Sequence, residues 1–187
     1  MRIHLPTVFL FLVLACCAAP AGVSYAATPE LKRTLVFRGI SYFYRWSKND
    51  ETEFTPEKQE DLNKWTDMIT VNDYPEAGDG ERLAATANAV LDNYKTHAGT
   101  VLKTRSIPRA ADRPAEHLIA VKFLRADFIE IAFARFTLVN GKGRSLVYSH
   151  RIYGSKIEDQ MNAWLSGNGD EVEKALLEWT AGGPLII

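Results

Sequence analysis

Residues 128–153 constrain the fold most, because two long apolar runs flank a turn signal there. The runs FIEIAFARFTLV and RSLVYSHRIY are joined through the tetrapeptide NGKG. Asn-Gly between two such runs is the strongest short-range signal for a β-hairpin. With Asn140 and Gly141 at the centre of the turn, Glu130 lies opposite Arg151. We therefore predict an antiparallel hairpin whose register is supported by a cross-strand ion pair.

β-branched and aromatic residues predict four more strands, at 34–46, 65–74, 100–106 and 117–124. In the first of these the apolar face switches at Gly39, for which a β-bulge or bend is the expected cause. The run HLIAVKFL is apolar on both faces, which is typical of an inner strand.

Three helices are predicted from periodicity and capping patterns. Apolar residues at spacings of three and four indicate one helix over residues 81–98. Two capping boxes, Ser155 with Glu158 and Asn168 with Glu171, predict two helices near the carboxyl terminus. The charge-dense residues between the first two strands are interpreted as a solvated excursion with a short helix.

These elements predict an α+β fold: a single mainly antiparallel sheet of about six strands, with one long central helix and two C-terminal helices packed on it. The long N-terminal strand, the tryptophan that opens the next strand and the Ala-rich helix together resemble the small sandwich domains of the PsbP and Mog1 group. The resemblance covers most of residues 27–187. It implies an accessory or binding protein and assigns no residue a role.

Residues 1–26 have the layout of a cleavable signal peptide. A basic start at Arg2 is followed by a short apolar run, a proline, and small residues up to Ala26. Cleavage there leaves residues 27–187 as one globular domain and removes Cys16 and Cys17, the only cysteines. The alternative is a lipid anchor at Cys16 in the lipobox-like string VLAC, which the bulky Leu14 disfavours.

The composition of the mature chain excludes several classes of function. Without cysteine it has no disulfide, no thiolate nucleophile and no Cys-ligated zinc. Its 21 Lys and Arg against 23 Asp and Glu give a formal charge of −2, which disfavours nucleic acid and anionic membrane surfaces as partners. No later apolar run approaches the length of a transmembrane helix.

Histidine is the residue type with most catalytic interest, because the common catalytic motifs GxxxxGK[ST], HExxH, CxxC, SxxK and GxGxxG are absent after the leader. His150 and His117 lie on apolar strand faces, where an imidazole needs a hydrogen-bond partner. Either is a candidate general base, helped by Glu116, Tyr148 or Arg135. Two histidines on separate strands supply no closely spaced ligand pair, so no metal site and no cofactor is predicted.

Two groups of residues are candidates for ligand binding. Aromatic side chains are expected to line a groove that the polar excursion at 47–64 covers as a flap: Tyr42, Tyr44, Trp46 and Phe54. Arginines recur at a spacing of four in RSIPRAADR and are suited to grip a carboxylate: Arg105, Arg109 and Arg113.

The first hypothesis is therefore an exported, non-catalytic binding or accessory protein of a bacterial periplasm or cell surface, whose partner is an unknown small molecule or protein. One alternative is an enzyme with a spatially assembled histidine site. Another is a protein-binding partner, such as an inhibitor or immunity-type protein, that uses a sheet edge or the arginine loop.

Intact-mass analysis of material secreted by the native host tests the leader. We expect a chain that begins at Ala27, because the signal layout ends at Ala26. A mass that includes earlier residues, or a diacylglycerol adduct, would contradict this.

Overall fold

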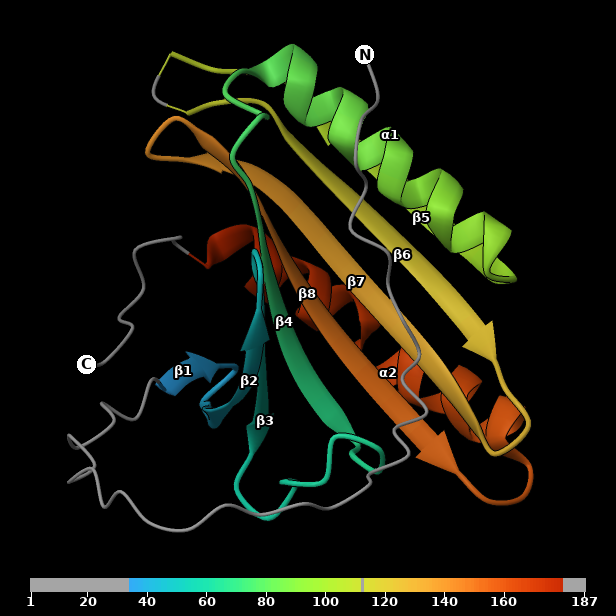
Figure 1. The fold of residues 1–187 in the computed structure, drawn as a ribbon. Helices are drawn as coiled ribbons and strands as arrows, with labels where there is room; N and C mark the ends of the chain where they lie inside the picture. Colours follow the sequence, from blue (N-terminus) through green and yellow to red (C-terminus); the bar gives the residue numbers. More distant parts are fainter. Residues whose placement is uncertain (1–33, 112, 180–187) are drawn as a thin grey trace, which may run out of the picture. The chain divides into compact units, whose positions relative to one another are not determined.

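The computed structural model describes residues 34–111 and 113–179. Eight of its elements are strands, which form one antiparallel sheet in the order β1-β2-β3-β4-β8-β7-β6-β5 (Figure 1). The elements in chain order are β1 (Thr34–Phe37), β2 (Ile40–Lys48), β3 (Glu51–Pro56), β4 (Asp67–Tyr74), α1 (Gly80–Thr96), β5 (Gly99–Ile107), β6 (Glu116–Leu124), β7 (Phe128–Val139), β8 (Lys142–Tyr153) and α2 (Ile157–Glu178).

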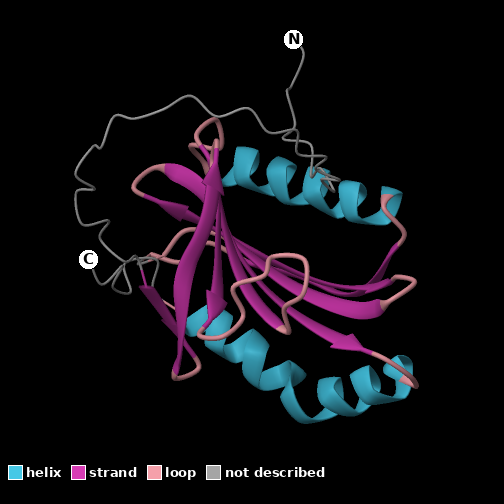
Figure 2. Cartoon of the chain, turned by 60° about the horizontal axis from the view of Figure 1, so that its bottom comes forward, coloured by secondary structure: helices cyan, strands magenta, loops and turns pink. Residues whose placement is uncertain are grey.

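The two helices cover opposite faces of the sheet (Figure 2). α1 packs on β5, β6 and β7, and α2 packs on β7 and β8. Strand β7 is apolar on both faces, so both need cover. Its residues on the α2 side are Ile129, Ile131 and Phe133. Its residues on the α1 side are Ala132, Ala134 and Phe136.

The predicted fold class is wrong in its count of elements: the sheet has eight strands instead of about six, and there are two helices instead of three. One extra strand comes from the N-terminal run, which is a hairpin and not a bulged strand. Arg38 and Gly39 have φ angles of 49° and 76° and form a two-residue turn. Leu35 therefore lies opposite Tyr42, on the same face of the sheet. The apolar residues change from odd to even numbers at Gly39 because the two strands pair across this turn.

The second extra strand, β3, lies inside the segment that the sequence predicts to be a solvated excursion. The chain turns at Asn49, whose φ is 54°, and pairs back along β2. Only Phe54 and Thr55 of β3 are fully buried. Two buried neighbours do not produce a visible alternation, and Pro56 ends this strand instead of starting a helix.

The two predicted C-terminal helices are one helix, α2, which continues through Gly167 and Gly169. Lys156 occupies its N-cap in a left-handed conformation, so the Ser155 capping box is absent. The Asn168 side chain donates to the Trp164 carbonyl within the helix and caps nothing. Tertiary packing outweighs the local signals, because three α2 side chains fill the core: Met161, Val172 and Leu176.

Three further predictions are confirmed: the β7–β8 hairpin, the pairing of Glu130 with Arg151 and the helix over most of residues 81–98. β7 and β8 form the expected hairpin, with Asn140 and Gly141 in the turn at positive φ. Glu130 faces Arg151, with 2.8 Å between Oε2 and Nε. α1 occupies most of its predicted range. Within the described ranges no helix is both long enough and apolar enough to span a membrane.

A buried ion pair anchors the carboxyl end of α2 to the sheet. The Arg135 guanidinium donates to both carboxylate oxygens of Glu116, at 3.0 and 2.7 Å. It also donates to the carbonyls of Leu176 and Trp179 at the end of the helix. A cation at this position complements the helix dipole and satisfies carbonyls that the helix leaves unpaired.

We expect Arg135→Ala to lower the free energy of unfolding by about 3–5 kcal/mol, because it leaves the buried Glu116 carboxylate unpaired. Urea unfolding of the mature chain measures the change. The control is Lys174→Ala, which breaks an exposed ion pair of 3.9 Å and should cost less than about 0.5 kcal/mol. An equal loss in both variants would contradict the anchoring role.

Candidate functional site

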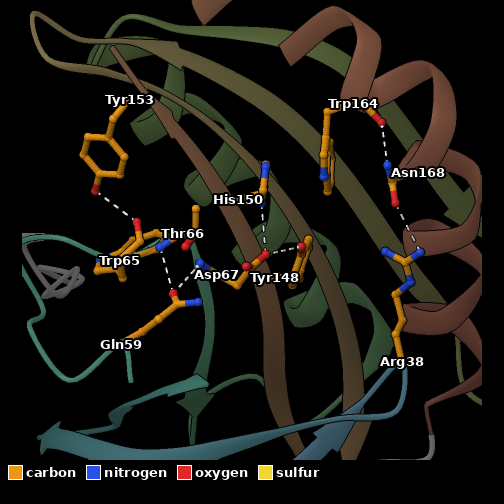
Figure 3. A network of polar contacts seen from close by, with 10 residues as sticks. All are labelled: Arg38, Gln59, Trp65, Thr66, Asp67, Tyr148, His150, Tyr153, Trp164 and Asn168. Carbon is orange, nitrogen blue, oxygen red and sulfur yellow. Dashed lines mark hydrogen bonds and ion pairs between the residues drawn. The ribbon is translucent and has the colours of Figure 1, made fainter. Parts of the chain in front are cut away.

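The first cluster of polar side chains surrounds Asp67 on the α2 side of the sheet (Figure 3). β4 pairs with β8 so that Asp67 lies directly opposite His150. The His150 Nδ1 atom is 3.0 Å from Asp67 Oδ1, and the Tyr148 hydroxyl donates to the same oxygen at 2.7 Å. The Gln59 side-chain oxygen accepts the backbone N–H groups of Thr66 and Asp67, which fixes the start of β4.

Trp164 of α2 covers one face of this cluster. Its ring stacks on the His150 imidazole with a centroid separation of 4.2 Å and an angle of 8° between planes. It also stacks on the Tyr148 ring at 6.3 Å and 19°. The imidazole is thus fixed by a carboxylate at one edge and by an indole on one face.

Electrostatics keep Asp67 ionised. Burial alone would raise its pKa, but the hydrogen bonds from His150 and Tyr148 and the charge of His150 lower the pKa overall. A carboxylate only accepts hydrogen bonds, so Nδ1 of His150 carries the proton. In the described part of the chain, no hydrogen bond to His150 Nε2 is found. Nε2 is therefore the ring nitrogen of His150 that remains without a hydrogen-bond partner among the described residues.

The second cluster lies where the edge strand β5 passes α2. Lys103 Nζ and Arg105 Nη1 contact the two carboxylate oxygens of Glu173, at 2.6 and 3.0 Å. Burial would raise the Glu173 pKa, but hydrogen bonds and charge from Lys103 and Arg105 lower it overall. A pocket of about 310 Å³ opens beside these residues. It is lined by Lys103, Arg105, Asp170, Glu173, Lys174, Leu177 and Glu178.

The structure separates the two candidate histidines. His150 faces α2, whereas His117 shares the α1 side with Ile119 and Val121. His117 Nδ1 lies 3.0 Å from the Ser106 hydroxyl, and Nε2 is buried with no hydrogen-bond partner. Burial lowers the pKa of His117, which favours a neutral imidazole.

Glu116, the third acid–base candidate, is bound by Arg135 at the end of α2. Both side chains are thereby committed to anchoring the helix. Among the described residues, no group of three His, Cys, Asp or Glu side chains has the geometry of a metal site.

The four aromatic candidates lie on β2 and β3, and two of them are core residues. Tyr42 and Phe54 are only 1% and 2% exposed and belong to the core beneath α2. Tyr44 packs edge-on against Phe54, with ring centroids 6.2 Å apart. Trp46 is half-buried opposite Glu53, beyond a register shift in β2. Within the segment expected to cover them as a flap, residues 51–56 form strand β3.

The three arginine candidates lie along one edge of the molecule. Arg105 belongs to β5, and Arg109 and Arg113 are exposed in the turn that follows it. Ala110 and Arg113 close this turn with a backbone hydrogen bond of 3.0 Å.

Sequence reasoning missed the partners of the candidates it chose. Asp67 lies on the same strand face as the apolar residues Ile69 and Val71. A polar residue on an apolar strand face is the signal that identified His150, and it identifies Asp67 equally well. Glu173 lies between the core residues of α2 without any comparable signal.

Comparison with known proteins finds no matching family model and no matching curated sequence. The structure resembles the Ran-binding protein Mog1p of Saccharomyces cerevisiae, with a TM-score of 0.45 and 6% identity over 78% of this chain and 92% of that chain. It resembles human STARD10 with a TM-score of 0.30 and 9% identity over 74% of each chain. The first likeness confirms the weak resemblance to the Mog1 group.

We expect Asp67→Asn to lower the free energy of unfolding by about 1.5–3 kcal/mol near neutral pH, because the hydrogen bonds from Tyr148 and His150 lose a charged acceptor. The folded pKa of Asp67 is depressed, so its contribution is present above the ordinary aspartate value and is lost as the pH falls through the lower folded value.

The stability difference between wild type and Asp67→Asn should therefore shrink below about pH 4, as measured by urea unfolding over a pH series. Asp127→Asn, at an exposed residue, serves as the control and should change stability little at any pH. A difference that is constant across the series would contradict the role of the charge.

Proposed function

We propose that the mature chain is an exported, non-catalytic binding domain that adds an extended segment of a partner protein to the sheet beside β5. The outer edge of β5, which pairs with no other strand among the described residues, is the observation that supports this most. β5 is nine residues long, pairs only with β6 in the described sheet, and is exposed from residue 100 to residue 106. An extended peptide binds such an edge through main-chain hydrogen bonds.

The charge of this edge favours a different protein over a second copy of the chain. When two β5 strands pair over their full length, Lys103 faces Lys103 of the other copy, and like charges directly opposite are destabilising. Segment 99–115 contains four cations and one acid, Asp112. We therefore infer a partner segment that carries acidic side chains.

At the other end of the sheet, the described part of β1 is a much shorter strand. It has four residues, against nine in β5, so it provides fewer main-chain hydrogen bonds to an added strand. The exported location follows from the predicted leader.

Selection of random peptides on the mature chain, followed by hydrogen exchange, tests this function. We expect selected peptides to be acidic and to slow amide exchange in β5 while leaving β1 unchanged. Only every second N–H group of a bound strand points toward β5. N-methylation of that alternating set of peptide residues should therefore abolish binding, whereas N-methylation of the other set should not. Protection of amides at a different surface, or an equal loss of binding from N-methylation of either alternating set of peptide residues, would overturn the proposal.

A second candidate function is acid–base catalysis at His150, favoured by the 3.0 Å contact of Nδ1 with Asp67 and by the available Nε2. The arrangement orients an imidazole as in known acid–base sites. Among the described residues, no serine, threonine or cysteine side chain takes part in the hydrogen bonds of this cluster.

We expect the mature chain not to turn over a panel of ester, peptide and phosphate substrates. Turnover that His150→Gln and Asp67→Asn both abolish, while Asp127→Asn leaves it intact, would replace the binding function with the catalytic one. Circular dichroism of each variant confirms that a loss of turnover does not reflect unfolding.

A further inference from the structure

We propose that the pocket between β5 and α2 selects acidic side chains at alternate positions of the added strand, through Arg105 and Lys103. This inference rests on the proposed strand addition and names the residues that would give it specificity. The partner is then an extended segment with Asp or Glu at every second residue, so that these acids all lie on one face of the added strand.

The cations of β5 are held on the α2 side of the sheet by Glu173. Each of its carboxylate oxygens contacts one cation, and its side chain is only 9% exposed. Lys103 and Arg105 keep side-chain exposures of 48% and 51%. Lysine has three N–H donors and arginine five, of which Glu173 takes one from each, so donors remain for a second carboxylate.

The geometry of strand addition places a partner side chain beside these donors. Lys103 and Arg105 are two residues apart and both reach α2, so they share one face of the edge strand. Side chains of an added strand alternate between the two faces, so every second one lies on the α2 side. A volume of about 310 Å³ is ample for a carboxylate side chain.

The pocket lining carries three cations and three acids, and both cations on its β5 side, Lys103 and Arg105, belong to the edge strand itself. Glu173 is committed to two cations, and Lys174 is 3.9 Å from Glu178 in an exposed pair. A partner lysine would find no uncommitted buried carboxylate. Asp170 is exposed at the rim and repels an incoming acid, so Asp170→Asn should strengthen binding of acidic peptides.

The test measures binding of two peptides of equal composition to the full mature chain. One peptide has glutamate at its odd positions and the other has glutamate at its even positions, which are the two alternating phases. We expect one of the two peptides to bind more tightly, by about 1.4- to 5-fold for each glutamate, which is the range of a cross-strand opposite-charge pair. Glutamine at those positions, or Arg105→Gln in the protein, should remove the preference. Arg109→Gln, in the exposed turn beyond β5, should leave the preference intact.

Glu173→Gln tests the positioning role of Glu173. If Glu173 only supports the fold, this variant lowers stability and keeps the phase preference. If it positions the two cations, the preference falls as well. Because Arg105 is half-exposed, Arg105→Gln should fold normally and keeps the test decisive where Glu173→Gln does not fold.

Hydrogen exchange separates the two proposals. Protection of β5 that is equal for both phases and for the glutamine peptide would overturn the acidic pocket and leave strand addition standing. No protection of β5 by either peptide would overturn both. Protection with a phase preference that Arg105→Gln removes supports both.

Discussion

The double-sided apolar surface of β7 is the constraint on which the rest of the structure depends. Its alternating side chains are buried on both faces, so a single layer of helices would leave one apolar face in water. α1 and α2 bury both apolar faces by packing on opposite sides of the sheet. Small residues, Ala132 and Ala134, lie on the face that α1 covers, and larger ones, such as Ile131 and Phe133, on the face that α2 covers.

The docking of α2 determines both candidate sites. Trp164, early in the helix, stacks on His150, and Glu173, two to three turns later, holds the cations of β5. Arg135 of β7 holds the carboxyl end of the helix against the sheet. The same helix that completes the core therefore orients an imidazole on β8 and a pair of cations on the edge strand.

Local signals predicted some elements well and others badly, for identifiable reasons. Asn140 and Gly141 accept positive φ easily, so the β7–β8 turn is visible in the sequence. Arg38 occupies the same kind of position in the β1–β2 turn, but arginine rarely adopts positive φ and gives no turn signal. In α2 the capping signals at Ser155 and Asn168 misled, because burial of Val172 and Leu176 stabilises a continuous helix.

The sequence by itself determined the α+β class, the β7–β8 register and the helix α1, because these follow from periodicity and turn chemistry between near neighbours. Only the tertiary structure decided that Asp67 meets His150, that His117 lies on the opposite face, and that Glu173 joins Lys103 to Arg105. Those contacts join residues 68 to 83 positions apart, or depend on which face each strand presents. Strand order and helix docking fix them, and no local pattern encodes either.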